Sequence, residues 1–171
     1  SGPGRIVPDP IRSLFTLSLF PVYPSALMVR GDVARSMQFP EDLAGVEDLY
    51  YAMALSQRGP AGIIEEPLAA LRRHGDNLSS ATPEQLERSI EAVRKFRERK
   101  LQPEHEDVVR EVLGKKLAGL GHQHFWNGRV SKSARAYLDA MSYPDSRATS
   151  LMHLLAIVLV PVLRHVNGED R

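Results

Sequence analysis

The sequence contains no cysteine, and this absence excludes a disulfide framework, a zinc site built from thiolates and a cysteine nucleophile. It also has no long uninterrupted apolar run. The longest run, residues 151–163, is broken by His153 and Pro161 and is shorter than the about 20 residues that cross a bilayer. Neither sign of charge is in excess, because 22 Lys and Arg oppose 21 Asp and Glu for a net charge of +1. The sequence therefore predicts no transmembrane helix and no nucleic-acid partner.

The length of 171 residues allows one sizeable domain or two small ones, and ordinary contents of charged (25%) and hydrophobic (43%) residues exclude global disorder. Residues 1–4 lack the basic and then apolar order of a signal peptide and contain no initiator Met. We therefore expect a processed chain or an excised piece with a cytoplasmic location, which the absence of cysteine suits. Peripheral contact with the inner face of the membrane, or self-association, remains an open role for residues 151–163.

The composition changes near residue 80, where we expect a boundary between residues 1–80 and residues 81–171. The first part is punctuated by Gly and Pro and has short apolar runs, so it predicts a short mixed sheet with helices. A buried strand is expected over residues 24–30 and a helix over residues 46–58, with Gly59-Pro60 as its stop. Two further short extended pieces are expected at residues 63–64 and 68–71.

The second part is strongly charged and helical, so the fold class predicted for the whole chain is α+β. Thr82 is a good N-cap, Pro83 suits the first helical position and Gln85 completes a capping box. The apolar stripe of this helix consists of Leu86, Ile90, Val93 and Phe96, and the helix should end near Gln102-Pro103. A second helix is expected from Glu104 to about Leu120. Positive and negative charges nearly balance along both helices, which indicates solvated faces with ion pairs and again no nucleic-acid binding.

From Lys116 onward the spacing of small and aromatic residues resembles one helical hairpin of the tetratricopeptide kind. The residues that carry this pattern are Ala118, Trp126, Gly128, Ala134, Tyr137, Ala140 and Pro144. We expect Trp126 and Phe125 to form the packing wedge of the hairpin, with a sugar-stacking platform as the alternative. The nearly all-round apolar segment at residues 150–166 should be buried as a cap on this helical layer, unless a partner or a membrane surface covers it.

Six short motifs occur in order between residues 24 and 79. They are Pro-Ser-Ala-Leu-Met-Val-Arg at 24–30, Phe-Pro-Glu-Asp-Leu at 39–43, Val-Glu-Asp-Leu at 46–49, Ser-Gln-Arg-Gly at 56–59, Glu-Pro-Leu at 66–68 and Arg-Arg-His-Gly-Asp-Asn-Leu-Ser at 72–79. Together they resemble the C-terminal, acceptor-side half of the catalytic domain of a family 2 glycosyltransferase, over about a third of the chain. The resemblance implies part of the A-type nucleotide-binding α/β fold, followed by a helical extension at residues 81–171.

The resemblance also implies inverting transfer of a sugar from a nucleotide-diphosphate donor to a hydroxyl of a glycan, lipid-linked or protein acceptor. Asp48 matches the catalytic base of the family, and Glu47 would shape the helix entry or orient the acceptor. Taken without the resemblance, an acidic pair in a first helical turn is explained by its favourable interaction with the helix dipole.

The last motif implies contacts with the donor diphosphate and with a divalent cation, Mn²⁺ or Mg²⁺. Arg72 would neutralise the leaving diphosphate, His74 would lie near the diphosphate and is a tentative metal ligand, and Ser79 would add a hydroxyl contact. The alternative is a positively charged loop that only ties down the last strand.

The family pattern is incomplete in this sequence, because it contains no Asp-x-Asp element and no N-terminal nucleotide-binding region. We therefore expect the acceptor-side half of a larger enzyme, inactive as an isolated chain. The alternative function is a non-catalytic module that binds a protein partner through its helical hairpin layer.

Overall fold

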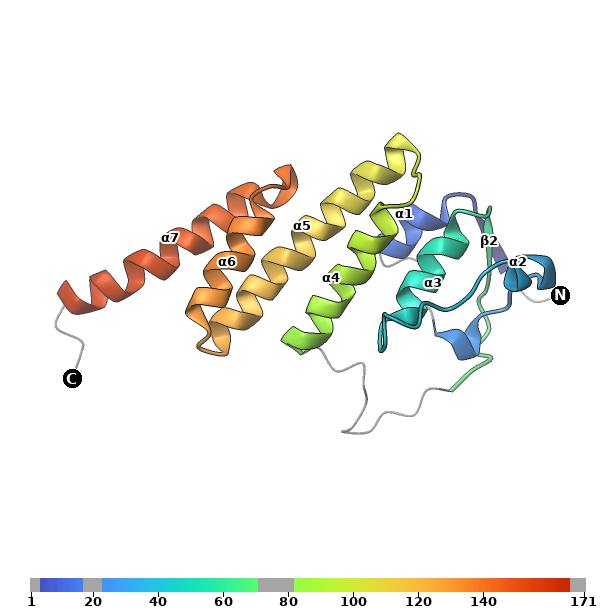
Figure 1. Cartoon of the computed structure of the whole chain (residues 1–171), viewed down its shortest axis with the longest axis horizontal. Coiled ribbons are helices and arrows are strands. Elements are labelled where there is room, and N and C mark those ends of the chain that lie inside the picture. The colour runs from blue at the N-terminus through green and yellow to red at the C-terminus, as the bar shows by residue number, and fades with distance from the viewer. Residues whose placement is uncertain (1–3, 17–22, 71–81, 167–171) are drawn as a thin grey trace. The chain divides into compact units, whose positions relative to one another are not determined.

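The computed structural model describes residues 4–16, 23–70 and 82–166, and this part of the chain is mostly helical with one small antiparallel sheet (Figure 1). The α+β class predicted from the sequence is confirmed at this level. The chain forms two compact units. The first unit comprises residues 1–81 and 91–109, and the second comprises residues 82–90 and 110–171.

The sheet of the first unit contains strands β1 (Gly4–Val7) and β2 (Ala61–Ile64), which pair antiparallel with Gly4 opposite Ile64 and Val7 opposite Ala61. The extended piece predicted at residues 63–64 is therefore confirmed, whereas β1 had no counterpart among the predictions. The expected mixed sheet is wrong for the described residues, because these two strands are antiparallel.

The strand predicted over residues 24–30 is also wrong. Pro24–Ala26 forms a 3₁₀ turn (η1), in which the Leu27 amide donates to the Pro24 carbonyl at 3.2 Å, and Gly31–Arg35 forms the short helix α2. Proline has a φ angle preset for a helical turn and no amide N–H to donate to a sheet, so Pro24 at the start of this segment favours a turn over a strand. Residues 68–70 are not in a strand either, and Leu71 lies outside the described residues.

Two helices position the candidate site of the first unit. Helix α1 (Pro10–Phe15) is capped by Asp9, whose Oδ1 accepts from the Arg12 amide at 3.0 Å, and it packs on α3. Helix α3 (Glu47–Ser56) confirms the helix predicted over residues 46–58. It buries four consecutive residues, Tyr51, Ala52, Met53 and Ala54. Gly59 follows with a φ of +139°, a conformation that favours glycine, so the predicted stop is confirmed.

Helices α4 (Pro83–Arg97) and α5 (Pro103–Trp126) each contribute residues to both units. The start of α4 is as predicted, since Thr82 Oγ1 accepts from the Gln85 amide at 3.1 Å. Its apolar stripe is buried at Ile90, Val93 and Phe96. Helix α5 is longer than predicted, because Gly121 stays helical and the chain turns only at Gly128, whose φ is +70°.

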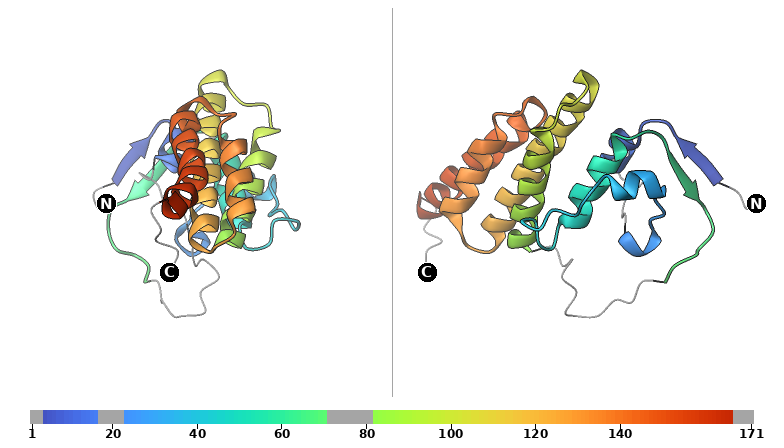
Figure 2. Two further views of the ribbon diagram at one scale, coloured as in Figure 1. Left: turned by 90° about the vertical axis from the view of Figure 1, so that its left-hand side faces the viewer. Right: turned by 45° about the vertical axis from the view of Figure 1, so that its right-hand side comes forward.

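The second unit contains the predicted helical hairpin, formed by the end of α5 and by α6 (Val130–Ala140), and α7 (Pro144–Val166) runs beside α6 (Figures 1 and 2). Close approach in the hairpin depends on Gly121, where an added Cβ would lie 3.0 Å from atoms of the Tyr137 ring. Tyr137 and Ala140 are fully buried, so the core of the hairpin contains two of the residues that the pattern marked.

Two expectations for this unit are wrong. Trp126 is 73% exposed and Phe125 is 39% exposed, so they are not the wedge of the hairpin. Tyr137 packs against Gly121 instead. Segment 150–166 is not buried all round, because α7 exposes one apolar face. This α7 face consists of Leu151, Met152, Leu155, Val158 and Leu159. Within the described residues, no helix has the length and apolarity needed to cross a membrane.

Candidate functional site

The acidic pair predicted as the catalytic centre lies in the first turn of α3. Gly45, with a φ of +85°, turns the preceding loop, and the buried side chains of Leu43 and Val46 hold that loop against the core. Val46 has no polar side chain with which to cap the helix, so Glu47 and Asp48 are the anionic groups nearest the free amides of the helix start. The positive end of the helix dipole at this place stabilises negative charge.

Asp48 is half-buried, and its Oδ1 accepts a hydrogen bond from the Leu49 amide at 2.7 Å. Burial raises the pKa of Asp48 above its ordinary value, and the nearby charge of Glu47 raises it further, while the Leu49 hydrogen bond acts in the opposite direction. A raised pKa makes the ionised carboxylate a stronger proton acceptor, as a general base requires.

Glu47 has one carboxylate oxygen, Oε2, that no described residue uses as a hydrogen-bond acceptor. Its Oε2 is buried and accepts no hydrogen bond from any residue in the described ranges 4–16, 23–70 and 82–166. A buried oxygen without a donor is unfavourable, so a ligand that offers a hydroxyl or amide here would relieve that cost. The pair therefore offers one proton acceptor, Asp48, beside one unused hydrogen-bond acceptor, Glu47.

Two residues at the end of α4 and just after it form hydrogen bonds with α3 and the segments on either side of it, although they come much later in the sequence. Lys95 Nζ donates to Asp42 Oδ1 at 2.6 Å, Arg99 Nε donates to Gln57 Oε1 at 2.9 Å and Arg99 Nη1 lies 3.3 Å from the Tyr50 hydroxyl. The hydrogen bond from Lys95 lowers the pKa of Asp42, in contrast to the raised pKa of Asp48. Lys95 and Arg99 were not predicted as supporting residues, because their partners are more than 40 positions away in the sequence.

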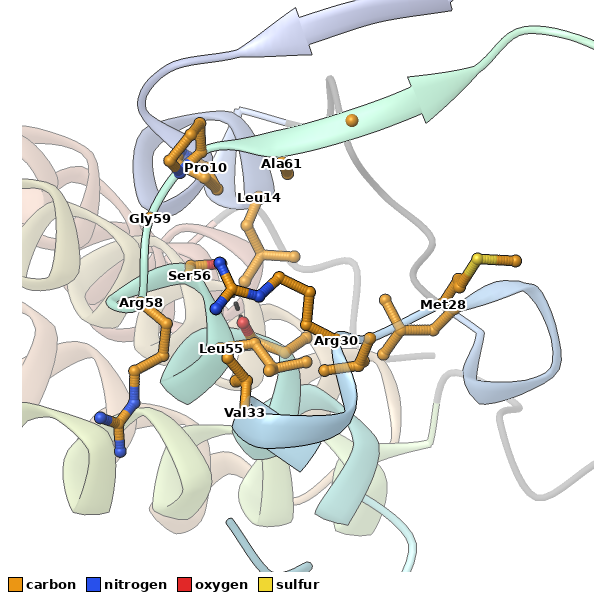
Figure 3. Close-up of a pocket in the computed structure, with 15 residues that line it drawn as sticks. Pro10, Leu14, Met28, Arg30, Val33, Leu55, Ser56, Arg58, Gly59 and Ala61 are labelled. Carbon is orange, nitrogen blue, oxygen red and sulfur yellow. Dashed lines mark hydrogen bonds between the residues drawn. The ribbon is translucent and has the colours of Figure 1, made fainter. Parts of the chain in front are cut away.

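A pocket of about 380 Å³ lies beside the C-terminal half of α3 (Figure 3). It is lined by residues of α1, α2, α3 and the start of β2, and Arg30 and Arg58 contribute its cationic groups. Ala52 belongs to the lining and follows Asp48 by one helical turn, so the pocket and Asp48 share one face of α3. This pocket was not predicted from the sequence, because its walls come from three separate stretches of the chain, residues 10–14, 27–33 and 52–62.

The remaining predicted site residues, Arg72, His74 and Ser79, lie outside the described residues. Among the residues that the structure does describe, no three His, Asp or Glu side chains gather in a way that could hold a metal ion. The divalent cation and the diphosphate contacts therefore stay predictions.

Comparisons with protein-family models, with curated proteins and with solved structures give no significant match to the chain. The resemblance to family 2 glycosyltransferases is thus carried by the motifs at residues 24–79 alone.

The variant Asp48→Asn is expected to be as stable as the native chain at neutral pH, or more stable. Because the pKa of Asp48 is raised in the folded state, its contribution to stability is greatest below the unfolded pKa and is lost as pH rises through the folded pKa. Asn imitates the protonated carboxyl at every pH, so the advantage of the variant should shrink as pH falls from about 7 to about 4. Urea denaturation of both proteins at the two pH values measures this difference.

The matched control is Asp42→Asn, which is expected to lower the stability at neutral pH. Its pKa is lowered by the hydrogen bond from Lys95, so its contribution to stability is present above the unfolded pKa and is lost as pH falls. An Asp48→Asn variant that loses stability at neutral pH, as Asp42→Asn should, would contradict the assignment of Asp48 as a buried, destabilising carboxylate.

Proposed function

We propose that this chain carries the acceptor-side part of a family 2 glycosyltransferase and that Asp48 is the catalytic base. The observation that carries the proposal is the acidic pair at the start of α3, in which Asp48 is half-buried with a raised pKa and Glu47 has an unpartnered buried oxygen within the described residues. This arrangement lies in the middle of the ordered motifs at residues 24–79.

The proposed reaction transfers a sugar from a nucleotide-diphosphate donor to an acceptor hydroxyl with inversion. The acceptor oxygen forms a bond to the anomeric carbon while the bond from that carbon to the diphosphate breaks, and the diphosphate leaves with the electron pair. A hydroxyl is too weak an acid to lose its proton beforehand, but its acidity rises as the new bond forms, so Asp48 accepts the proton in the same step. Glu47 accepts a second hydrogen bond from the acceptor and thereby orients it.

The proposal predicts that the chain binds glycans through Asp48 without any nucleotide present. Saturation-transfer NMR with a panel of mono- and oligosaccharides should show a defined subset that binds. Asp48→Ala should weaken this binding about tenfold, because it removes a hydrogen bond to a charged group.

The control for this experiment is Asp42→Ala, which removes an acid of the preceding loop that is engaged by Lys95. Its glycan binding should equal that of the native chain. Absence of any saturable glycan binding, or equal losses in the two variants, would count against the proposed function.

The exposed α7 face favours a second candidate function, that of a non-catalytic interaction module. It presents five large apolar side chains in the second unit, and apolar patches of this kind mark surfaces that other molecules cover. The same NMR panel separates the two functions, because an interaction module has no reason to bind glycans through Asp48.

A further inference from the structure

The pocket of the first unit combines an apolar wall with cationic groups. Leu14 of α1, Val33 of α2 and Leu55 of α3 are among the apolar side chains that line it. Its volume of about 380 Å³ lies within the range of roughly 300–1,000 Å³ that is typical of small-molecule sites. In Figure 3, Met28 stands at one end of the lining residues and Arg58 at the other.

The apolar end of the pocket leaves a large side chain in water. Met28 belongs to the lining, yet it is 92% exposed. A flexible thioether side chain adapts its shape to different apolar ligands, and covering it would remove its apolar surface from water. This end therefore suits a hydrocarbon chain.

The cationic end has a charge that no residue in the described part of the chain balances. Arg30 donates from Nε and Nη2 to Asp32, at 3.1 and 2.5 Å, so its charge is already paired. The Arg58 guanidinium has no ion pair or side-chain hydrogen bond with any residue that the structure describes. A guanidinium binds phosphate or carboxylate oxygens in a bidentate manner, so Arg58 suits an anionic group.

We propose that this pocket binds an anionic amphiphile, with its hydrocarbon chain along the apolar wall to Met28 and its phosphate or carboxylate on Arg58. This inference rests on the proposed function in one respect: the amphiphile is then a lipid-linked acceptor. The pocket reaches Ala52, one turn after Asp48 on the same helix, so an acceptor anchored there has its sugar on the Asp48 side of α3.

Dodecyl phosphate, used below its micelle concentration, tests the proposal by isothermal titration calorimetry. It should bind at a single saturable site. Dodecyl maltoside has the same chain and an uncharged head, and butyl phosphate has the same head and a short chain. Both should bind at least about tenfold more weakly, because each lacks one of the two interactions.

Two variants locate the binding in the pocket, and both change exposed side chains. Arg58→Gln should weaken dodecyl phosphate binding about fivefold, the upper range for an exposed ion pair. Met28→Gln should weaken it by a similar factor through lost burial of apolar surface. The matched controls are Arg35→Gln in α2 and Met152→Gln in α7, exposed residues outside the pocket, and they should bind as the native chain does.

Absence of saturable binding overturns the proposal, as do equal affinities for dodecyl phosphate and dodecyl maltoside or equal affinities of the pocket variants and their controls. Binding to phospholipid vesicles without binding of dodecyl phosphate monomers also overturns it, since the site is then a membrane surface. Asp48→Ala should leave dodecyl phosphate binding unchanged. A failure of the proposed glycosyl transfer, seen in the glycan panel, is thus separate from a failure of the amphiphile site.

Discussion

Phe96→Ala is expected to lower the free energy of unfolding of the chain by about 3–5 kcal/mol, the typical cost of removing a fully buried aromatic ring. Phe96 has no exposed surface and ends the buried stripe of α4. Its removal deletes apolar contacts and leaves a cavity that the surroundings fill only in part. Because domains of this size have total stabilities of about 5–15 kcal/mol, the variant should be close to unfolded at moderate temperature. Urea denaturation followed by circular dichroism measures the loss.

The control for this variant is Phe39→Ala in the same unit. The Phe39 ring stacks on Tyr51, with centroids 4.2 Å apart and planes 6° from parallel, but it is 47% exposed. Its removal should cost about 1 kcal/mol, the usual value of an aromatic pair. Equal losses in the two variants would show that Phe96 does not occupy the core position described above.

Gly114→Ala is expected to lower the free energy of unfolding by about 2 kcal/mol or more, the range of overpacked cores. An added Cβ would lie 2.5 Å from Ser146 Oγ and 2.7 Å from Tyr143 Cβ, so α5 and the start of α7 would have to separate. The helix propensity of Ala offsets only about 1 kcal/mol of this cost. Ser146→Ala in addition should not restore stability, because the clash with Tyr143 Cβ remains.

A second Gly→Ala substitution in α5 serves as the control, because the opposite effect on stability is expected there. At Gly119 an added Cβ would meet Leu86 Cδ2 at 3.7 Å, an ordinary van der Waals distance. Gly119→Ala should therefore raise the free energy of unfolding by up to about 1 kcal/mol, through helix propensity alone. Thermal unfolding of the two single variants compares them directly, and destabilisation by both would show that the distances around Gly119 are shorter than described.

The elements predicted correctly from the sequence are those specified by neighbouring residues. Thr82 and Pro83 begin α4, Gly59 follows α3, and the hairpin turns at Gly128, each through interactions within a few positions of the chain. The elements that were missed or wrong depend on distant partners. Strand β1 exists only because β2, more than 50 positions later, pairs with it, and residues 24–30 lack such a partner strand among the described residues.

The candidate site shows the same division. The adjacent acids Glu47 and Asp48 could be predicted as a candidate site, because they occupy the first turn of a predicted helix. The interaction of Lys95 with Asp42 could not be predicted, because the two residues are 53 positions apart and the charges of that helix indicated solvated faces. The pocket depends on three stretches of the chain that only folding brings together. Trp126 was predicted to pack between the helices because it belongs to the hairpin pattern, yet its indole N–H donates to His122 Nε2 at 2.9 Å on the surface of α5.

The division of α4 and α5 between the two units affects how this protein could exchange parts during evolution. A recombination event at the composition change near residue 80 would transfer residues 1–81 without residues 91–109, which complete the same compact unit. The acidic pair would then arrive in a new protein without Lys95 and Arg99, and without the ring of Phe96. Inheritance of a complete first unit therefore requires a crossover beyond residue 109, so that α4 is inherited together with residues 1–81.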